Sequence, residues 1–130
     1  MTDSELFRAA LAAADNAHAP YSGFRVGAAL LCADGSLFCG ANIENASYGA
    51  TVCAERVALF QAVFAGKRAF SAIAVAAFDR SGAAVSAPPC GICRQALSEF
   101  SDGSLRVLFG TEDDLARTTL GELLPHGFNL

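Results

Sequence analysis

Two short cysteine motifs constrain the fold of this chain more than any other feature of its sequence. The first is Cys53-Ala54-Glu55 and the second is Cys90-Gly91-Ile92-Cys93. Cys90 and Cys93 are three residues apart, so both thiols lie on one side of the first turn of a helix. Cys53 and Glu55 are only two apart, and they can face one point only beyond the N-terminal end of their helix. The spacing therefore predicts two helices whose N-termini point at a common site.

Three thiols are one ligand short of a closed tetrahedral zinc site. Structural zinc sites take four protein ligands, whereas catalytic sites take three and leave the fourth position for water. Cys53, Cys90 and Cys93 therefore predict an open zinc site. Glu55 is the acidic group placed to move the proton of that water. Helix N-termini also favour thiolates, because their partial positive charge lowers a cysteine pKa. The motifs indicate a zinc hydrolase or deaminase.

The negative charge of such a site needs a neighbouring positive group that offsets part of it. Three thiolates give the zinc centre a net charge of about −1, which weakens its action as a Lewis acid. Arg56 follows Glu55 directly and is predicted to donate hydrogen bonds to the sulfurs. Two interpretations of Arg94 remain open: it also donates to the sulfurs, or it is a solvated residue of its helix. Cys32 and Cys39 lack ligand spacing and are predicted to pack as small apolar side chains.

Composition narrows the class of protein. The 130 residues suit one domain spanning 1–130, and 53% hydrophobic with 17% charged residues excludes a disordered chain and hints at apolar surface buried between subunits. A net charge of −4 without a Lys/Arg cluster argues against nucleic acid as a partner. No stretch approaches transmembrane length, so no membrane partner is expected. Five cysteines do not suit a secreted disulfide framework, and a cytoplasmic protein with reduced thiols is expected.

Alternating helical and strand patterns predict an α/β fold, a three-layer α-β-α sandwich around a mixed five-stranded sheet. Helices are predicted for residues 4–16, 52–66, 90–100 and 120–124, and strands for 24–33, 36–41, 71–78, 105–109 and 116–120. Thr2 and Glu5 form a predicted capping box, and Asp34-Gly35 indicates a hairpin. The crossover through helix 90–100 predicts a parallel pair of strands. Residues 79–87 are predicted to be turn, and helix 52–66 to be largely buried.

Cys-x-Glu followed by Pro-Cys-x-x-Cys is the signature of zinc deaminases. Beyond it, the chain resembles the cytidine deaminases of the short, three-cysteine type over nearly its full length. The segments that carry the resemblance are Pro20-Tyr21-Ser22, residues 24–29, 42–49, 53–56 and 89–95, Leu123-Leu124-Pro125 and Phe128.

The resemblance implies a role for each matching residue. The three thiols would bind one zinc ion per chain, and Glu55 would shuttle the proton of a zinc-activated water. Asn42 and Glu44 match the residues that hold the ribose, chiefly at its 3′-hydroxyl. Phe24 matches the aromatic residue beside the base, and the backbone N–H of Ala54 the contact to the base carbonyl.

The resemblance also implies the reaction and the assembly. The expected function is deamination of cytidine and 2′-deoxycytidine to uridine and 2′-deoxyuridine, with release of ammonia, in pyrimidine salvage. A 3′-hydroxyl contact suits both substrates, so the sequence sets no preference between them. The family forms homotetramers, in which Tyr48 and Phe128 would be donated to a neighbouring chain's site.

Three other interpretations remain open. A related deaminase acting on blasticidin or on a free base would share the zinc chemistry, although Asn42-x-Glu44 favours a substrate with a sugar. Editing of tRNA or single-stranded DNA is disfavoured by the acidic charge. In a structural zinc module Glu55 would be incidental, and Phe24 and Phe128 would be ordinary core aromatics.

Overall fold

A mixed β-sheet forms the middle layer of the protein. The computed structural model describes residues 1–130. The helices are α1 (Asp3–Ala13), α2 (Ala54–Phe64), α3 (Gly91–Phe100) and α4 (Leu120–Leu123), with 3-10 turns η1 (Ala14–Asn16) and η2 (Tyr48–Ala50). The strands are β1 (Arg25–Cys32), β2 (Leu37–Ala41), β3 (Phe70–Phe78), β4 (Ala84–Val85), β5 (Arg106–Gly110) and β6 (Leu115–Thr119). No helix has the length and apolar character needed to span a lipid bilayer.

The strand order is β2-β1-β3-β5-β6, and β4 adds to β3. β1 pairs antiparallel with both β2 and β3, and β5 pairs antiparallel with β6. β3 and β5 are parallel, which confirms the predicted crossover through α3. The predicted capping box is also present, because the Thr2 hydroxyl and the Glu5 carboxylate bond each other's backbone N–H.

The sequence predicted that residues 79–87 are all turn, and this prediction was wrong for Ala84 and Val85, which form a strand. The chain turns sharply after β3 and returns to pair Phe78 with Ala84 in β4, which gives the sheet a sixth, two-residue strand. The Asp79 carboxylate fixes this turn by accepting hydrogen bonds from the backbone N–H groups of Ser81 and Ala83 at 2.9 and 3.0 Å. Gly82 supplies the positive φ of +88° that the turn requires.

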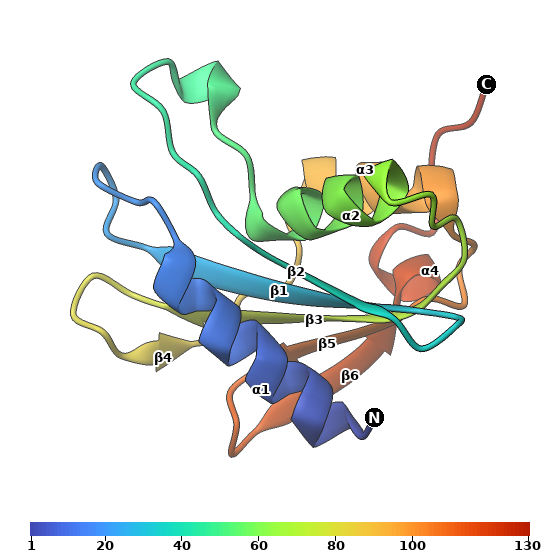
Figure 1. Ribbon diagram of the computed structural model, residues 1–130, viewed down its shortest axis with the longest axis horizontal. Coiled ribbons are helices and arrows are strands. Elements are labelled where there is room, and N and C mark those ends of the chain that lie inside the picture. Colours follow the sequence, from blue (N-terminus) through green and yellow to red (C-terminus); the bar gives the residue numbers. More distant parts are fainter.

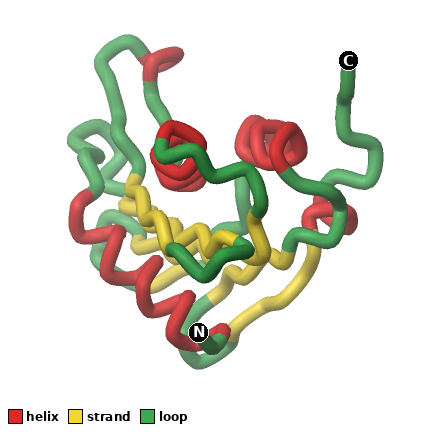
Figure 2. The backbone as a smooth tube through the Cα atoms, turned by 45° about the vertical axis from the view of Figure 1, so that its right-hand side comes forward, coloured by secondary structure: helices red, strands yellow, loops and turns green.

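Helices cover both faces of the sheet, which confirms the three-layer sandwich. α1 lies on one face, and α2, α3 and α4 lie on the other (Figure 1). The tube view shows the same order, with the strands between the helices (Figure 2). One core cluster joins Leu6, Phe7 and Ala10 of α1 to Ala72, Ala74 and Ala76 of β3. The other joins Ala58 and Leu59 of α2 and Leu97 of α3 to Ile73 and Val107.

Two strand glycines allow the helices to approach the sheet closely. A Cβ atom on Gly27 of β1 would lie 1.9 Å from the carbonyl oxygen of Ala10 in α1. A Cβ atom on Gly40 of β2 would lie 2.5 Å from the backbone nitrogen of Ala58 in α2. The helix backbones therefore rest directly on the strands. Gly40 in particular sets the height of α2, whose first turn carries Glu55.

Gly40→Ala is expected to destabilise the protein by about 1–3 kcal/mol, because the added methyl group overlaps the α2 backbone and no side-chain movement can relieve the clash. Urea unfolding followed by circular dichroism measures the change. Gly49→Ala is the matched control, since a Cβ atom there meets nothing within 4 Å. Equal stability of the two variants would contradict the close approach of α2 to β2.

Helix α2 is less buried in the single chain than its apolar sequence predicted. Ala54, Glu55, Ala58, Leu59 and Ala62 face the sheet. Phe60 and Phe64 face away, and the Phe64 side chain is 96% exposed. The prediction was wrong for the isolated chain because it took every apolar residue of the helix as a core residue. An exposed pair of phenylalanines on one helix face is instead typical of a surface that meets another protein.

Candidate active site

The three predicted ligand thiols meet between the N-termini of α2 and α3. Cys53 is the N-cap residue of α2 and Cys90 is the N-cap residue of α3, both with extended backbone. Cys93 follows one turn later and is fully buried. The three Sγ atoms lie within 4.8 Å of one another, and the Cys53 and Cys90 sulfurs are 3.6 Å apart. Placing two cysteines at the N-caps solves the problem posed by the spacing of Cys53 and Glu55.

This thiol cluster fits Zn²⁺. Sulfurs at about 2.3 Å from a tetrahedral zinc ion are about 3.8 Å from each other, close to the separation of the Cys53 and Cys90 sulfurs. The cluster contains three sulfurs that could hold an ion, so a fourth tetrahedral position would be left for a non-protein ligand. The site therefore has the ligand number of a catalytic zinc site and not of a structural one.

Hydrogen bonds within the cluster favour loss of the proton from one thiol, that of Cys53. A hydrogen bond from the Cys93 thiol, with further hydrogen bonds from Arg56 and Cys90, lowers the pKa of Cys53 to about 5. The same bond between the two thiols, together with burial, raises the pKa of Cys93. Cys53 therefore loses its proton more readily than Cys93, and a bound Zn²⁺ would displace the proton that Cys93 holds.

Arg56 lies beside the sulfurs, as predicted. Its Nη2 atom is 3.7 Å from the Cys53 sulfur and 3.5 Å from the carbonyl oxygen of Thr51. Its guanidinium charge therefore offsets part of the negative charge of the thiolates. Arg94 instead donates to the carbonyl oxygens of Pro89 at 2.7 Å and Leu123 at 3.0 Å, which ties the start of α3 to α4. The open question about Arg94 is answered by these contacts, which are structural.

Glu55 is a buried carboxylic acid next to the thiols. Its side chain belongs to the first turn of α2, and the residue is only 4% exposed. Burial raises the pKa of the Glu55 carboxyl, and the negative charge of Cys53 acts in the same direction. The backbone N–H groups of Glu55 and Cys90 act against this rise. A carboxyl whose pKa is raised toward neutrality can both accept and deliver a proton.

A cavity of about 230 Å³ opens onto Glu55 and two of the thiols. It also brings together Phe24, Asn42 and Ala54, three residues that the sequence singled out for substrate contacts. The remaining walls come from Val26, Thr51, Val75, Ala87 and Pro88. The sequence reasoning missed these five because they are small or apolar residues with no chemical signature of their own. The cavity wall is mostly apolar and carries a few polar groups, which suits a flat heterocyclic base.

Asn42 bridges the cavity wall. Its Oδ1 atom accepts from the Val26 N–H at 2.9 Å, and its Nδ2 atom donates to the Phe24 carbonyl oxygen at 2.8 Å. An amide group has two donor hydrogens, so one N–H remains for a ligand in the cavity. The same bonds also fix the start of β1 and with it Phe24.

Glu44 lines a second, more polar cavity of about 320 Å³, together with Tyr21, Ser22, Asn45, Tyr48 and Thr51. Thr51 borders both cavities, so they adjoin. Hydrogen bonds from the Ser22 hydroxyl and from the Ser22 and Tyr21 backbone N–H groups hold the pKa of Glu44 below its usual range. Glu44 is therefore an ionised acceptor at neutral pH, beside the cavity that contains Glu55.

Tyr48 and Phe128 lie far apart in the single chain. Tyr48 is 80% exposed on the segment between β2 and α2, which rises away from the sheet, and its ring meets the Tyr21 ring edge-on (Figure 1). Phe128 lies in the C-terminal segment at the opposite side of the view, where Gln95 bonds both its N–H and its carbonyl. Phe128 is not among the residues around Glu55, so it does not complete the site of its own chain.

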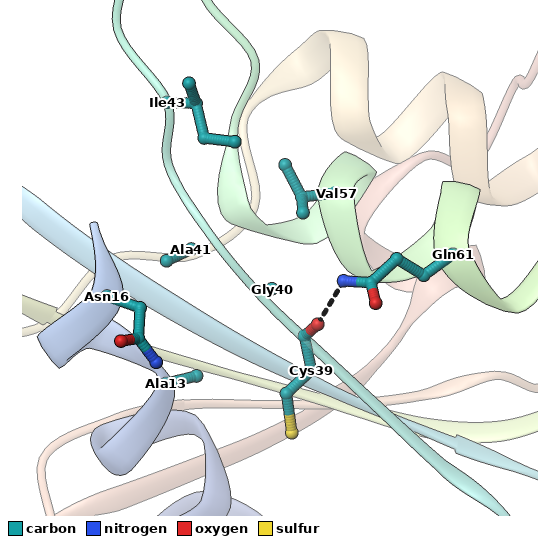
Figure 3. A pocket seen from close by; sticks show the side chains of 8 residues that line it. All are labelled: Ala13, Asn16, Cys39, Gly40, Ala41, Ile43, Val57 and Gln61. Atoms are coloured by element: carbon teal, nitrogen blue, oxygen red, sulfur yellow. Dashed lines mark hydrogen bonds between the residues drawn. The ribbon is translucent and has the colours of Figure 1, made fainter. Parts of the chain in front are cut away.

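A third cavity, of about 270 Å³, lies over the edge strand β2, and none of the three predicted ligand cysteines lines it (Figure 3). Gln61 crosses it and donates to the Cys39 carbonyl oxygen at 2.7 Å. Burial raises the pKa of the Cys39 thiol, which makes it a poor nucleophile. Cys39 is half-buried and Cys32 is buried, and both thiols are free, which agrees with their predicted packing role.

Comparison with known protein families indicates the same kind of site as the geometry does, a zinc site. A family model described as the cytidine and deoxycytidylate deaminase zinc-binding region matches residues 1–111. This match includes all three thiols, Arg56 and Glu55. The fold, the open three-thiol site and the family match together define a zinc-dependent hydrolytic deaminase.

Individual relatives narrow the class further. The chain is 48% identical to a cytidine deaminase of Halalkalibacterium halodurans, over 95% of this chain and 91% of that protein. The crystal structure of cytidine deaminase from Burkholderia pseudomallei superimposes with a TM-score of 0.90 at 46% identity, over 98% of this chain and all of that one. A blasticidin-S deaminase of Bacillus cereus is more distant, at 34% identity over 85% of this chain and 77% of that protein. The protein belongs to the cytidine deaminase family.

Proposed function

We propose that this protein deaminates cytidine and 2′-deoxycytidine, giving the corresponding uridines and ammonia, and that residues 1–130 act as one catalytic domain. The observation that carries the proposal is the pair of adjoining cavities. One is largely apolar and contains Glu55 and two thiols, and the other is polar and contains Glu44. A base in the first and a sugar in the second make a nucleoside.

Glu55 would act on the protons of the reaction. Cys53, Cys90 and Cys93 would hold Zn²⁺, which when bound would lower the pKa of a water molecule toward neutrality and supply a nucleophile at physiological pH. The Glu55 carboxylate accepts a proton from that water and delivers it to N3 of the base. The water oxygen forms its bond to C4, and the electron pair of the C4–N3 double bond moves to N3.

The same carboxyl group would complete the reaction. It carries the remaining proton of the attacking oxygen to the amino nitrogen, the C4–N bond breaks, and ammonia leaves as the C4 carbonyl forms. Burial of Glu55 supports this role, because a raised pKa makes the group effective both as base and as acid near neutral pH.

Substrate binding would use the groups that the chain leaves unpaired. The free N–H of Asn42, from the wall of the first cavity, and the Glu44 carboxylate, in the second, would together hold the sugar, chiefly at its 3′-hydroxyl. Phe24 would lie beside the base. The backbone N–H of Ala54, at the start of α2, would donate to the base carbonyl, since the first N–H groups of a helix have no partner within it.

An ultraviolet assay with four substrates tests the function. The zinc-loaded protein is incubated with cytidine, 2′-deoxycytidine, free cytosine and blasticidin S, and conversion is followed by absorbance and ammonia release. We expect turnover of both nucleosides and little of the other two. Turnover of blasticidin S or cytosine alone would replace the proposed substrate, and zinc binding without any turnover would leave a structural zinc module.

A homotetramer would complete the site with residues from neighbouring chains. Exposed apolar side chains support an assembly, namely Ile43, Phe60 and Phe64, the last two on one face of α2. Ile43 borders the cavity over the edge strand β2, so an exposed apolar side chain also lies at this edge of the sheet (Figure 3). The exposed positions of Tyr48 and Phe128 suit rings that enter the site of another chain, with Phe128 stacking on the base.

Light scattering is expected to give four times the chain mass of 13.4 kDa. Mixing supplies the sharper test of shared sites. Phe128→Ala and Glu55→Gln chains, each weakly active alone, should regain turnover when unfolded and refolded together, because some sites then receive both native residues. A fully active monomer would contradict the proposal, as would a mixture no more active than its components.

The reaction would serve pyrimidine salvage in the cytoplasm. All five cysteines are free, and the reducing cytoplasm would keep the three ligand thiols available to zinc.

A further inference from the structure

The Glu44 carboxylate has one acceptor position left after its contacts within the chain. Its Oε1 atom accepts from the backbone N–H groups of Tyr21 at 2.9 Å and Ser22 at 3.1 Å. Its Oε2 atom accepts from the Ser22 hydroxyl. A carboxylate offers about four acceptor positions, so one on Oε2 remains for a ligand. The direction of that position is set by the turn that holds the other three.

Arg80 binds the opposite side of the same turn. Its Nη2 atom donates to the Tyr21 carbonyl oxygen at 2.9 Å, and its Nε atom donates to the Ser22 carbonyl oxygen at 3.1 Å. The peptide between Tyr21 and Ser22 thus gives its N–H to Glu44 and its C=O to Arg80. Gly23 makes room for this contact, since a Cβ atom there would lie 3.1 Å from Cγ of Arg80.

The backbone of Arg80 is itself fixed to the sheet. Arg80 lies in the turn between β3 and β4, which the Asp79 carboxylate closes through the N–H groups of Ser81 and Ala83. The Ser22 hydroxyl also accepts from the Phe24 N–H at 2.9 Å. A continuous set of contacts therefore runs from the sheet through Arg80 and Ser22 to both Glu44 and Phe24.

We propose that Arg80 is a positioning residue for the sugar of the substrate, acting through the Tyr21–Ser22 turn on Glu44. This inference rests on the proposed function, in which Glu44 accepts a hydrogen bond from the 3′-hydroxyl. Arg80 does not line either cavity, and its side chain donates hydrogen bonds only to the two carbonyl oxygens. Its loss leaves the carboxylate in place but lets the turn, and with it the free acceptor position, adopt other orientations.

Arg80→Ala is expected to raise KM for cytidine about fivefold to tenfold and to change kcat less than about twofold, because Glu55 lies in the other cavity. Arg68→Ala is the matched control. Arg68 is also exposed and also donates to two carbonyl oxygens, those of Val63 and Lys67, far from the sugar cavity. Arg80→Lys, which keeps the charge and one donor, should recover part of the affinity.

A substrate without the hydroxyl separates positioning from general damage. With 2′,3′-dideoxycytidine, wild type and Arg80→Ala should have the same KM, since the group that Glu44 binds is missing. An unchanged KM for cytidine in Arg80→Ala overturns the inference, and so does an equal rise for both substrates. Arg80→Gln replaces the alanine variant in both comparisons if the latter does not fold. Absence of wild-type turnover would overturn the proposed function itself, a result distinct from either of these.

Discussion

Glu55→Gln is expected to bind zinc normally and to lose about 10²–10⁴-fold in kcat, the contribution typical of a positioned general acid–base group. The amide has nearly the shape of the carboxyl, so the cavity and the three thiols stay in place. It cannot accept a proton from water or deliver one to N3. Metal analysis and the ultraviolet assay on the same sample measure both quantities. A zinc-loaded variant with more than about a tenth of wild-type turnover would remove Glu55 from the proton transfers.

The same substitution has an expected effect on stability. Burial raises the pKa of Glu55 above its value in the unfolded chain, so the folded state holds this proton more tightly. The contribution of Glu55 to the free energy of unfolding therefore falls as pH rises from the pKa of the unfolded chain through the pKa of the folded state. Glutamine carries no such charge. The melting temperature of Glu55→Gln, relative to wild type, should thus increase with pH across this window, and a difference independent of pH would contradict it.

The cysteine motifs predicted the site better than periodicity predicted the elements around it. Cys53 and Glu55 could share a target with Cys90 and Cys93 only at two helix N-termini, and both N-caps are cysteines. The crossover from β3 to β5 followed from the handedness and length rules for parallel strands. In each case a local pattern left only one geometric solution.

The features that the sequence did not predict depend on contacts between distant segments. Strand β4 exists because Asp79 folds the chain back, and a two-residue strand has no periodicity to detect. Arg80 and Ser22 are 58 residues apart, and neither residue carries a motif that indicates the other. The exposed Phe60 and Phe64 have the same apolar pattern as core residues, because a pattern cannot distinguish a protein core from a surface between subunits.

Cys93→Ser is expected to abolish zinc binding and to lower turnover by at least about 10³-fold, because the metal supplies the activated nucleophile. Cys93 is the fully buried member of the cluster, and a neutral serine hydroxyl is a much poorer zinc ligand than a thiolate. Cys39→Ser is the control, since Cys39 belongs to the edge strand β2, outside the thiol cluster. It should keep one zinc per chain and wild-type turnover.

Metal removal then separates loss of zinc from loss of fold. A chelator should lower both the turnover and the melting temperature of wild type, because an ion that binds only the folded state stabilises it. Adding zinc back should restore both in wild type and in Cys39→Ser, and neither in Cys93→Ser. Full recovery of turnover in Cys93→Ser would show that two thiols suffice. The three-thiol site would then no longer explain why this chain brings two helix N-termini together.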